Sequence, residues 1–478
     1  MTCVGRRVSV EDRMLSDNAL LNARIPLHRL PRELLAEVFL FTQSNGEPGA
    51  WLTILHVCRH WFVVAATTPR IWCTLLVRGN VNLLRTGLAR VKSCPVTVAV
   101  DMADRVDNTL TLLSPHMHNL SRLLLHVVAR EDVPLLTAFM ENRMPMLQFF
   151  SARILRKSID DSPSEPVIEF TPERHPRLKS LGLHGIQVPP SSTIFSQLTH
   201  LELRGWLGIA PELALDDLAR ILRSCINLHL LIIENVLVSG VDHTTVESPA
   251  QGRTLLPNLR LVLIDTYSQI TRVILGVLSI PPAASVHVRL ADLFDDPEED
   301  IMRGIRASMP ADRSSLPLLA HIKGVNLTMT RVFYTMFGST DAIVSKTLAL
   351  YPHPWVELTM EVPSSIPTFG YLRLGHLDLL DVFRGAPLEV LDLTIDSGMV
   401  GTFDWPATFW AFPALQSFKI RTDANCIDVL DIFSGLGPRR ASDSGGRRKK
   451  IARQQRHAHT SGACASSVRC SGRIARGE

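Results

Sequence analysis

The stretch IPLHRLPRELLAEVFLFTQ starts at Ile25, and the stretch WLTILHVCRHWFVVAATTPRIWCTLLV starts at Trp51. Together they carry the most regular apolar pattern of the chain, so they decide the fold of its first part. Pro31 suits the first turn of a helix, because an N–H at that position would have no partner within the helix. Glu33 then places a carboxylate at the positive end of the helix dipole.

Both stretches carry apolar residues at the spacing of an amphipathic helix. In the first stretch they recur every four residues, at Leu30, Leu34 and Val38 and at Leu35 and Phe39. In the second stretch they share one face, at Ile54, Cys58, Trp61 and Ala65. The loop SNGEPG separates the two helices, and Pro69 ends the second one before Trp72. We expect three short helices around a small core, with an apolar edge that a partner would cover.

The order and spacing of these residues resemble an F-box. The matching positions are Leu30, Pro31, Glu33, Leu34, Leu35, Val38, Phe39, Val57, Cys58, Trp61, Pro69 and Trp72. The variant with a Pro-Gly loop is similar to the F-box-like proteins of mushroom-forming fungi. The loop before Trp51 is longer and more polar than in a compact F-box. The resemblance covers residues 25–77 only.

The resemblance implies a substrate-receptor subunit that is not an enzyme. F-box proteins dock onto the Skp-family adaptor of a cullin-based ubiquitin ligase and hold a protein substrate on a second domain. By position, Leu30, Pro31 and Leu34 would contact the adaptor. The other matches would hold the helices together as a core: Leu35, Val38, Phe39, Val57, Cys58, Trp61, Pro69 and Trp72. The alternative is a protein-interaction scaffold outside the ubiquitin system, whose helical N-terminus is only a cap.

A leucine pattern, L-x-x-L-x-L or a relative of it, recurs after residue 115. It starts at Leu120, Leu147, Leu178, Leu198, Leu228, Leu259, Leu388 and Leu415. The first six starts are about 20 to 31 residues apart, near the period of leucine-rich repeats. Residues 78–436 are therefore predicted to form an α/β fold, a degenerate leucine-rich-repeat-like solenoid of alternating strands and helices. A doubly wound α/β sheet is the alternative. The pattern is weakest between Thr271 and Phe383.

Charge is concentrated at the C-terminal end of the chain. The formal net charge is +4, and residues 438–478 hold eleven Arg and Lys against Asp443 and Glu478. This stretch has no apolar periodicity, so residues 437–478 are predicted to be a disordered basic tail. Its RRKKIARQQR segment resembles a nuclear-import signal. The alternatives are a segment that attracts nucleic acid without specificity and a basic run that is only solvated. Residues 1–24 are predicted to be a flexible lead.

Sequence patterns of catalytic and cofactor sites are absent. There is no GxxxxGK[ST], GxGxxG after a strand, HEXXH or GxSxG motif. His116 and His118 have no third ligand nearby, and the eight cysteines form no CxxC pair. We therefore expect no catalytic residue, cofactor or metal. No signal peptide or eighteen-residue apolar run occurs, which indicates an intracellular protein, cytoplasmic or nuclear, that does not enter a membrane.

Overall fold

The computed structural model describes most of the chain between Ile25 and Arg421. The described residues are 25–45, 49–78, 81–101, 106–155, 167–205, 212–239, 252–290, 304–330, 333–342, 353–361, 368–395, 403–421 and 468–470. The predicted lead, the acidic run at 295–300 and most of the predicted basic tail lie outside these ranges. The chain divides into two compact units, Met1–Ile194 and Phe195–Glu478. Each unit combines helices with a largely parallel sheet, so the mixed α/β class is confirmed.

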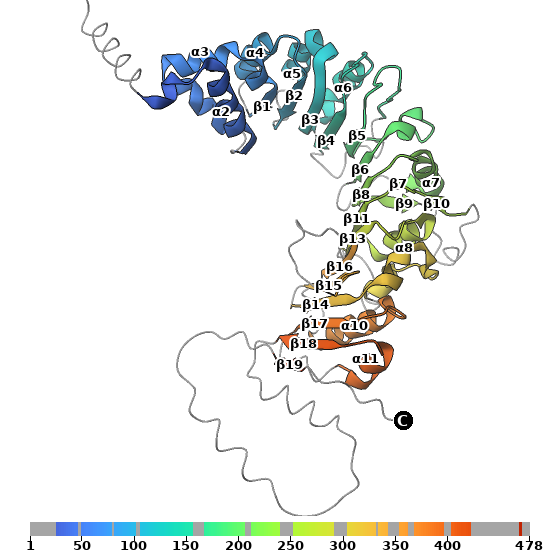
Figure 1. Cartoon of the computed structure of the whole chain (residues 1–478). Helices are drawn as coiled ribbons and strands as arrows, with labels where there is room; N and C mark the ends of the chain where they lie inside the picture. Colours follow the sequence, from blue (N-terminus) through green and yellow to red (C-terminus); the bar gives the residue numbers. More distant parts are fainter. Residues whose placement is uncertain are drawn as a thin grey trace, which may run out of the picture. The chain divides into compact units, whose positions relative to one another are not determined.

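The described part of the first unit begins with short helices and continues as a parallel sheet (Figure 1). Its α-helices are α2 (Arg32–Asn45), α3 (Arg59–Thr67), α4 (Val81–Val91), α5 (Val106–Leu113) and α6 (Val133–Met140). Its 3-10 helices include η1 (Pro26–Arg29), η2 (Ala50–His56), η3 (Pro69–Trp72), η5 (Ser114–Asn119) and η6 (Arg130–Asp132). Its strands β1 (Thr74–Val77), β2 (Val96–Val100), β3 (Leu120–Ala129), β4 (Phe149–Leu155) and β5 (Ser180–His184) pair in parallel, in chain order.

The expectation of an all-helical segment at residues 25–77 is wrong at its C-terminal end. Thr74–Val77 form β1, which pairs with β2 and buries Leu75 and Val77. Two of the three expected helices are the α-helices α2 and α3, whereas Pro69–Trp72 is a single 3-10 turn. The helical segment therefore also supplies the first strand of the sheet.

The second unit repeats strand and helix with the same parallel pairing. Its helices are α7 (Leu215–Ser224), α8 (Ser268–Val277), η8 (Ile305–Ser308), η9 (Arg313–Ser315), η10 (Pro317–His321), α10 (Thr368–Val382) and α11 (Trp405–Ala411), and η7 (Thr193–Gln197) spans the boundary. Its main strands are β6 (His200–Arg204), β8 (Leu230–Glu234), β11 (Leu261–Thr266), β13 (Ser285–Leu290), β14 (Gly324–Met329), β15 (Phe333–Ser339), β16 (Trp355–Glu361), β17 (Val390–Thr394), β18 (Ser417–Arg421) and β19 (Val468–Cys470). Short strands β7 (Glu212–Ala214) and β9 (Leu237–Ser239) pair with each other, as do β10 (Thr254–Leu255) and β12 (Leu278–Ser279).

The strand order of this sheet departs from chain order at one place. The order is β6-β8-β11-β13-β16-β15-β14-β17-β18-β19. Strands β14, β15 and β16 form an antiparallel meander that runs back toward β13, and β17 then pairs in parallel with β14. The sequence pattern did not predict this reversal. Residues 368–382, within the stretch where the leucine pattern is weakest, form helix α10.

The same backbone turn precedes many of the strands. The N–H of a buried leucine donates to the carbonyl three residues earlier, at Leu147, Leu178, Leu198, Leu228 and Leu259 and again at the half-buried Leu415. These leucines are six of the eight predicted repeat starts, and the turn residues before them include Pro145, Pro176, Pro257 and Pro413. Proline favours such turns because its φ is already set. The recurring leucine pattern therefore marks a turn that reverses the chain before a strand.

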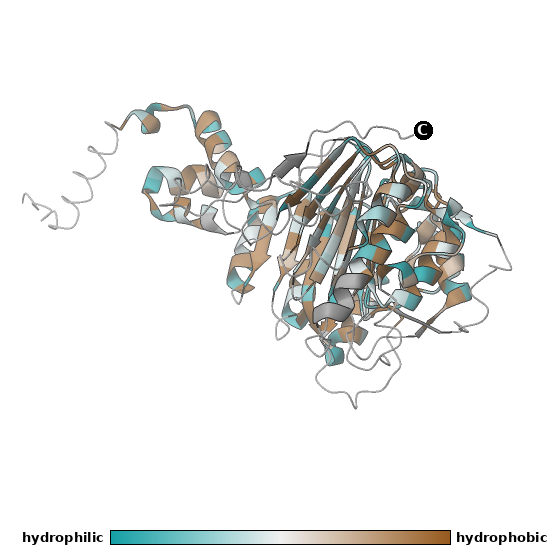
Figure 2. Cartoon of the chain, turned by 90° about the horizontal axis from the view of Figure 1, so that it is seen from below, coloured by the Kyte–Doolittle hydropathy of each residue, from teal (hydrophilic) through white to brown (hydrophobic). Residues whose placement is uncertain are grey.

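One face of the sheet in the second unit is covered by helices. Figure 1 shows α7, α8, α10 and α11 on one side of the strands, and Figure 2 shows helices in one layer beside the sheet. Burial alternates along the strands, and in β11 the sequence LVLIDT buries every second residue. The buried residues face the helices, whereas the others, such as Asp265, point to the opposite face. We name that opposite side the open face, because no helix among the described residues covers it.

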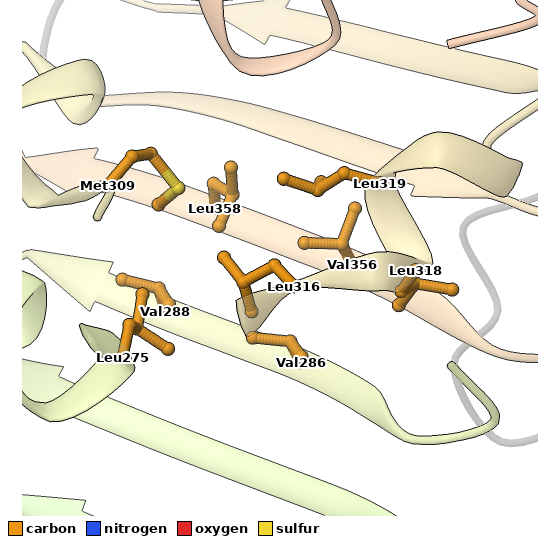
Figure 3. A pocket seen from close by; sticks show the side chains of 9 residues that line it. All are labelled: Leu275, Val286, Val288, Met309, Leu316, Leu318, Leu319, Val356 and Leu358. Atoms are coloured by element: carbon orange, nitrogen blue, oxygen red, sulfur yellow. The ribbon is translucent and has the colours of Figure 1, made fainter. Parts of the chain in front are cut away.

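The irregular segment η8–η10 covers β13 and β16 in place of an α-helix. Met309, Leu316, Leu318 and Leu319 from this segment pack over Val286, Val288, Val356 and Leu358 of the two strands and over Leu275 of α8 (Figure 3). A cavity of about 10 Å³ is left between them. Space of this size holds at most one water, and its lining offers no polar partner, so the interface is a dry apolar core.

A buried carboxylate fixes the start of the segment η8–η10. The side chain of Asp378, on α10, is fully buried, and it accepts hydrogen bonds from the N–H of Ile305 at 2.6 Å and the N–H of Arg306 at 3.3 Å. The Tyr334 hydroxyl donates to the same carboxyl group. Gly304 has φ +65° and lies against the Asp378 carboxyl group, so a larger side chain would not fit there. Burial raises the pKa of Asp378 to about 6, against the opposing effect of these donors.

The alternation of burial can be tested on two adjacent leucines of β8. Leu231 is fully buried toward the helices, whereas Leu230 is half-buried on the open face. We expect Leu231→Ala to lower the free energy of unfolding by about 2–5 kcal/mol, because it leaves a cavity. The matched Leu230→Ala should cost about 1 kcal/mol or less. Urea unfolding followed by circular dichroism measures both, and equal losses would contradict the assigned faces.

The raised pKa of Asp378 predicts a specific pH dependence of stability. The folded chain holds the proton of the Asp378 carboxyl group up to about pH 6, whereas an unfolded aspartate loses it at about pH 4. The stabilisation of the fold by this proton is therefore present at low pH. It is lost as the pH rises from about 4 to about 6, by about 3 kcal/mol. Asp378→Asn should remove this dependence. We would measure the unfolding free energy of both proteins across this range; a constant difference between them would contradict the shift.

Candidate functional site

Helix α2 carries apolar residues on two of its faces. On the inner face Leu35 and Phe39 are 0% and 1% exposed. On the outer face Leu34, Val38 and Phe41 are 53%, 40% and 72% exposed. The outer residues follow one another at i, i+4 and i+7, so they form one continuous stripe. We name Leu34, Val38 and Phe41 the α2 stripe.

Aromatic packing holds α2 from behind. The rings of Phe39 and Trp61 lie 5.1 Å apart, and those of Trp51 and Trp72 lie 5.2 Å apart, edge to face. The Trp72 Nε1–H donates to the Ala65 carbonyl at 2.8 Å, so this large buried side chain has its polar atom satisfied. The inner face is thereby fixed, and the α2 stripe is left pointing outward.

Polar contacts and a stacked arginine tie the helices to their surroundings. The Gln43 Nε2 donates to the Ile71 carbonyl at 3.1 Å, and Arg70 pairs with Glu37 at 2.7 Å. The Arg90 guanidinium, on α4, lies 4.5 Å from the ring centre of Trp72. This cation–π contact joins the helical segment to the first strand–helix pair of the sheet.

The structure separates the residues that the sequence grouped as an F-box core. Leu35, Phe39 and Trp72 are buried, and Cys58, Trp61 and Pro69 are half-buried. Val38 and Val57 are 40% and 55% exposed, so their assignment to the core is wrong. Val38 lies one turn after Leu34 and shares its outward face. Val57 ends η2 just before Cys58, whose extended backbone redirects the chain.

The predicted adaptor-contacting residues lie at the N-terminal end of the α2 stripe. Pro31 and Leu34 are exposed, and Leu30 is half-buried. The sequence analysis missed Phe41, the most exposed member of the stripe, although its spacing from Leu34 already placed it on the same face. Ile25 and Leu27 are 43% and 36% exposed and add further apolar surface before the helix. Contiguous exposed apolar surface of this kind marks a binding site for another molecule.

The open face of the second unit carries a charged cluster across five strands. Arg204 of β6 pairs with Glu234 of β8 at 2.6 Å. Asp265 of β11 lies 3.9 Å from Arg289 of β13, whose Nε donates to Glu361 of β16 at 3.0 Å. These residues lie in adjacent register positions, Arg204 beside Glu234, Glu234 beside Asp265, and Asp265 beside Arg289.

Burial and neighbouring charges shape the electrostatics of this cluster. Burial raises the pKa of Asp265 above its usual value; Glu234 and Glu361 add to the rise, and Arg289 opposes it. The hydrogen bond to Glu361 is the main cause that raises the pKa of Arg289. Carboxylates outnumber arginines here, so the cluster suits a positively charged partner surface.

Aromatic side chains adjoin the charged cluster on the open face. Trp355 stacks on Phe337 with ring centres 6.0 Å apart, and it meets His287 edge to face at 6.3 Å. His287 Nδ1 lies 3.0 Å from Glu357. Protein-binding surfaces typically combine aromatic rings with charged groups. The rings supply contact area and the charges supply specificity.

The described residues hold no assembly of metal-binding groups. No group of three or more His, Cys, Asp and Glu in this part of the chain is placed to hold a metal ion. Burial, together with the nearby His118, lowers the pKa of His116, so this imidazole is neutral near pH 7. Searched over the same residues, no helix has the length and apolar character needed to cross a bilayer.

No model of a known protein family and no curated protein sequence matches this chain. Its function is therefore inferred from the α2 stripe, the open face and the resemblance of residues 25–77 to an F-box.

The two faces of α2 can be tested with adjacent leucines. We expect Leu35→Ala to lower the free energy of unfolding by about 2–5 kcal/mol, because this side chain is fully buried. Leu34→Ala removes an exposed side chain, so its effect should stay within about 0.5 kcal/mol. Thermal unfolding followed by near-UV circular dichroism reports on the tryptophan environment of this region. A large loss in Leu34→Ala would show that the stripe is packed against the chain itself.

Proposed function

We propose that this protein is a substrate receptor of a Skp–cullin–F-box ubiquitin ligase. In this role the α2 stripe, with Leu30 and Pro31 at its N-terminal end, inserts into an apolar groove of the Skp-family adaptor. The observation that carries the proposal is the exposure of Leu34, Val38 and Phe41 on a helix whose opposite face is fixed by buried aromatic residues. An exposed apolar face of this kind gains free energy when a partner covers it.

In the same proposal the open face of the second unit binds the protein substrate. The repeated leucine turns, parallel strands and single layer of helices support a degenerate leucine-rich-repeat solenoid, whose strands offer a broad surface to a partner. The charged cluster and the half-buried Trp355, which stacks on the buried Phe337, supply specificity on this surface. The protein would act in the cytoplasm or nucleus as an adaptor without catalytic residues or a cofactor, and ubiquitin transfer would belong to other subunits.

One observation favours a second candidate function. β1 pairs with β2 and Arg90 stacks on Trp72, so residues 25–77 are joined to the sheet as a cap would be. In that case the protein is an interaction scaffold outside the ubiquitin system. Deletion of residues 25–72 distinguishes the two functions, because a pure cap is required for the rest of the first unit to fold. If the helices of a receptor only bind the adaptor, the sheet stays folded after they are deleted.

The adaptor-binding role predicts a selective loss of binding. We expect Leu34→Ser/Phe41→Ser to weaken binding to a purified Skp-family adaptor by about a hundredfold or more, because two apolar side chains no longer leave water on binding. The control Leu255→Ser/Trp410→Ser removes two other exposed apolar side chains, which are 65% and 88% exposed in the second unit. It should bind as the wild type does. Surface plasmon resonance with immobilised adaptor measures all three proteins.

Two results would contradict the adaptor role. One is a folded wild-type chain that does not bind the adaptor. The other is equal binding by the wild type and the stripe variant. Circular dichroism spectra of each variant establish that a loss of binding does not come from unfolding.

A further inference from the structure

A pocket lined by arginines lies in the second unit, between α8, the segment η8–η10 and the end of α10. Its volume is about 800 Å³, within the range of small-molecule sites. Its basic residues include Arg272, Arg306, Arg313 and Arg384. Asp381 is the one carboxylate among the described residues of the lining, so positive charge is in excess. We name this site the arginine pocket.

The acidic partners do not neutralise the arginines. Asp381 is shared by Arg313 at 2.7 Å and Arg384 at 3.2 Å. Arg306 lies 3.9 Å from Asp378, whose carboxyl group is already occupied by two backbone N–H groups and by Tyr334. One carboxylate between two guanidinium groups leaves donors and charge for a further anion.

Two buried guanidinium atoms of the arginine pocket have no hydrogen-bond partner among the described residues. They are Nη1 of Arg313 and Nε of Arg272. An unpaired buried donor costs free energy, and the cost is larger for a charged group. Burial lowers the pKa of Arg313, with Arg384 and Arg272 adding to the effect and Asp381 opposing it. The like charges therefore repel one another, and a bound anion would relieve both the repulsion and the unpaired donors.

Part of the pocket lining is apolar. Met309, Leu316, Leu319 and Val382 contribute to it, and the first three also pack over β13 and β16 (Figure 3). We name these four residues the apolar wall, three of which also belong to the dry core. A ligand with a compact anionic group and an attached apolar group matches this division.

We propose that the arginine pocket binds a phosphate ester, with the phosphate between Arg272, Arg313 and Arg384 and the organic group against the apolar wall. Guanidinium groups suit phosphate because their planar donors match its oxygen atoms in pairs. A free small-molecule ester and a phosphorylated side chain present the same chemistry. The site is separate from the α2 stripe, so it does not depend on adaptor binding.

Calorimetric titration of the full-length chain with phenyl phosphate tests the site. We expect saturable binding by the wild type that weakens as salt rises. Arg384→Gln and Arg272→Gln should each weaken binding about tenfold, because each removes a charge-assisted hydrogen bond. Arg220→Gln is the matched control: it removes the same charge from α7, where Arg220 pairs with Asp217 outside the pocket, and it should leave binding unchanged.

Asp381→Asn gives the sharpest test, because its expected effect has the opposite sign. It removes the carboxylate that competes for Arg313 and Arg384, so phenyl phosphate should bind more tightly. A variant that merely disturbed the fold would bind more weakly. The same titration with a phosphotyrosine pentapeptide identifies the source: tighter binding than phenyl phosphate assigns a protein ligand, and weaker binding assigns a free ester.

Three results would overturn the proposal. The first is no heat of binding with a wild type whose circular dichroism spectrum is that of a folded protein. The second is equal weakening by Arg220→Gln and Arg384→Gln, which indicates non-specific attraction. The third is weaker binding by Asp381→Asn when its melting temperature equals that of the wild type.

Discussion

The alternation of side chains along each strand is the constraint on which both units depend. A strand turns successive residues to opposite faces, so a helix layer can bury only every second residue. In β8 and β11 most of the buried positions are apolar, as at Leu231, Ile233, Val262 and Ile264. The positions between them are free to carry charge, and this freedom creates the row from Arg204 to Arg289 on the open face. Core and binding surface are thus two consequences of one backbone geometry.

The recurring turn before the strands makes this arrangement repeatable. A parallel strand needs a connection that returns the chain to the same end of the sheet. The turn at each buried leucine lies at the end of this connection. The next strand then pairs in register with the strand before it. Where the pattern fails, between β13 and β14, the chain covers the sheet with short 3-10 helices. The start of this cover is held by the buried carboxyl group of Asp378. The arginine pocket lies along this irregular cover, where no regular helix fills the layer.

Much of this organisation could be predicted from the sequence, because it depends on local periodicity. The buried faces of α2 and α3, the position of Pro31 and the leucines before the strands all follow from spacing along the chain. The exposure of Val38 did not follow from spacing alone. A helix with apolar residues on two faces does not reveal which of them meets the rest of the protein. Val57 was misplaced because the extended backbone at Cys58 changes the chain direction, and no local pattern marks that change.

The sequence by itself determined the mixed α/β class, the helices within residues 25–77, the recurring leucine pattern and the absence of familiar catalytic motifs. Each of these depends on residues close together in the chain. Only the tertiary structure decided that Phe41 belongs to an exposed stripe, that β14 to β16 reverse direction, and that Arg272, Arg313 and Arg384 line one pocket. These three arginines lie far apart in sequence, and the repulsion between them arises only when α8, η9 and the end of α10 pack together. The physical reason is that burial and charge proximity are properties of packing between distant segments, which no spacing along the chain encodes.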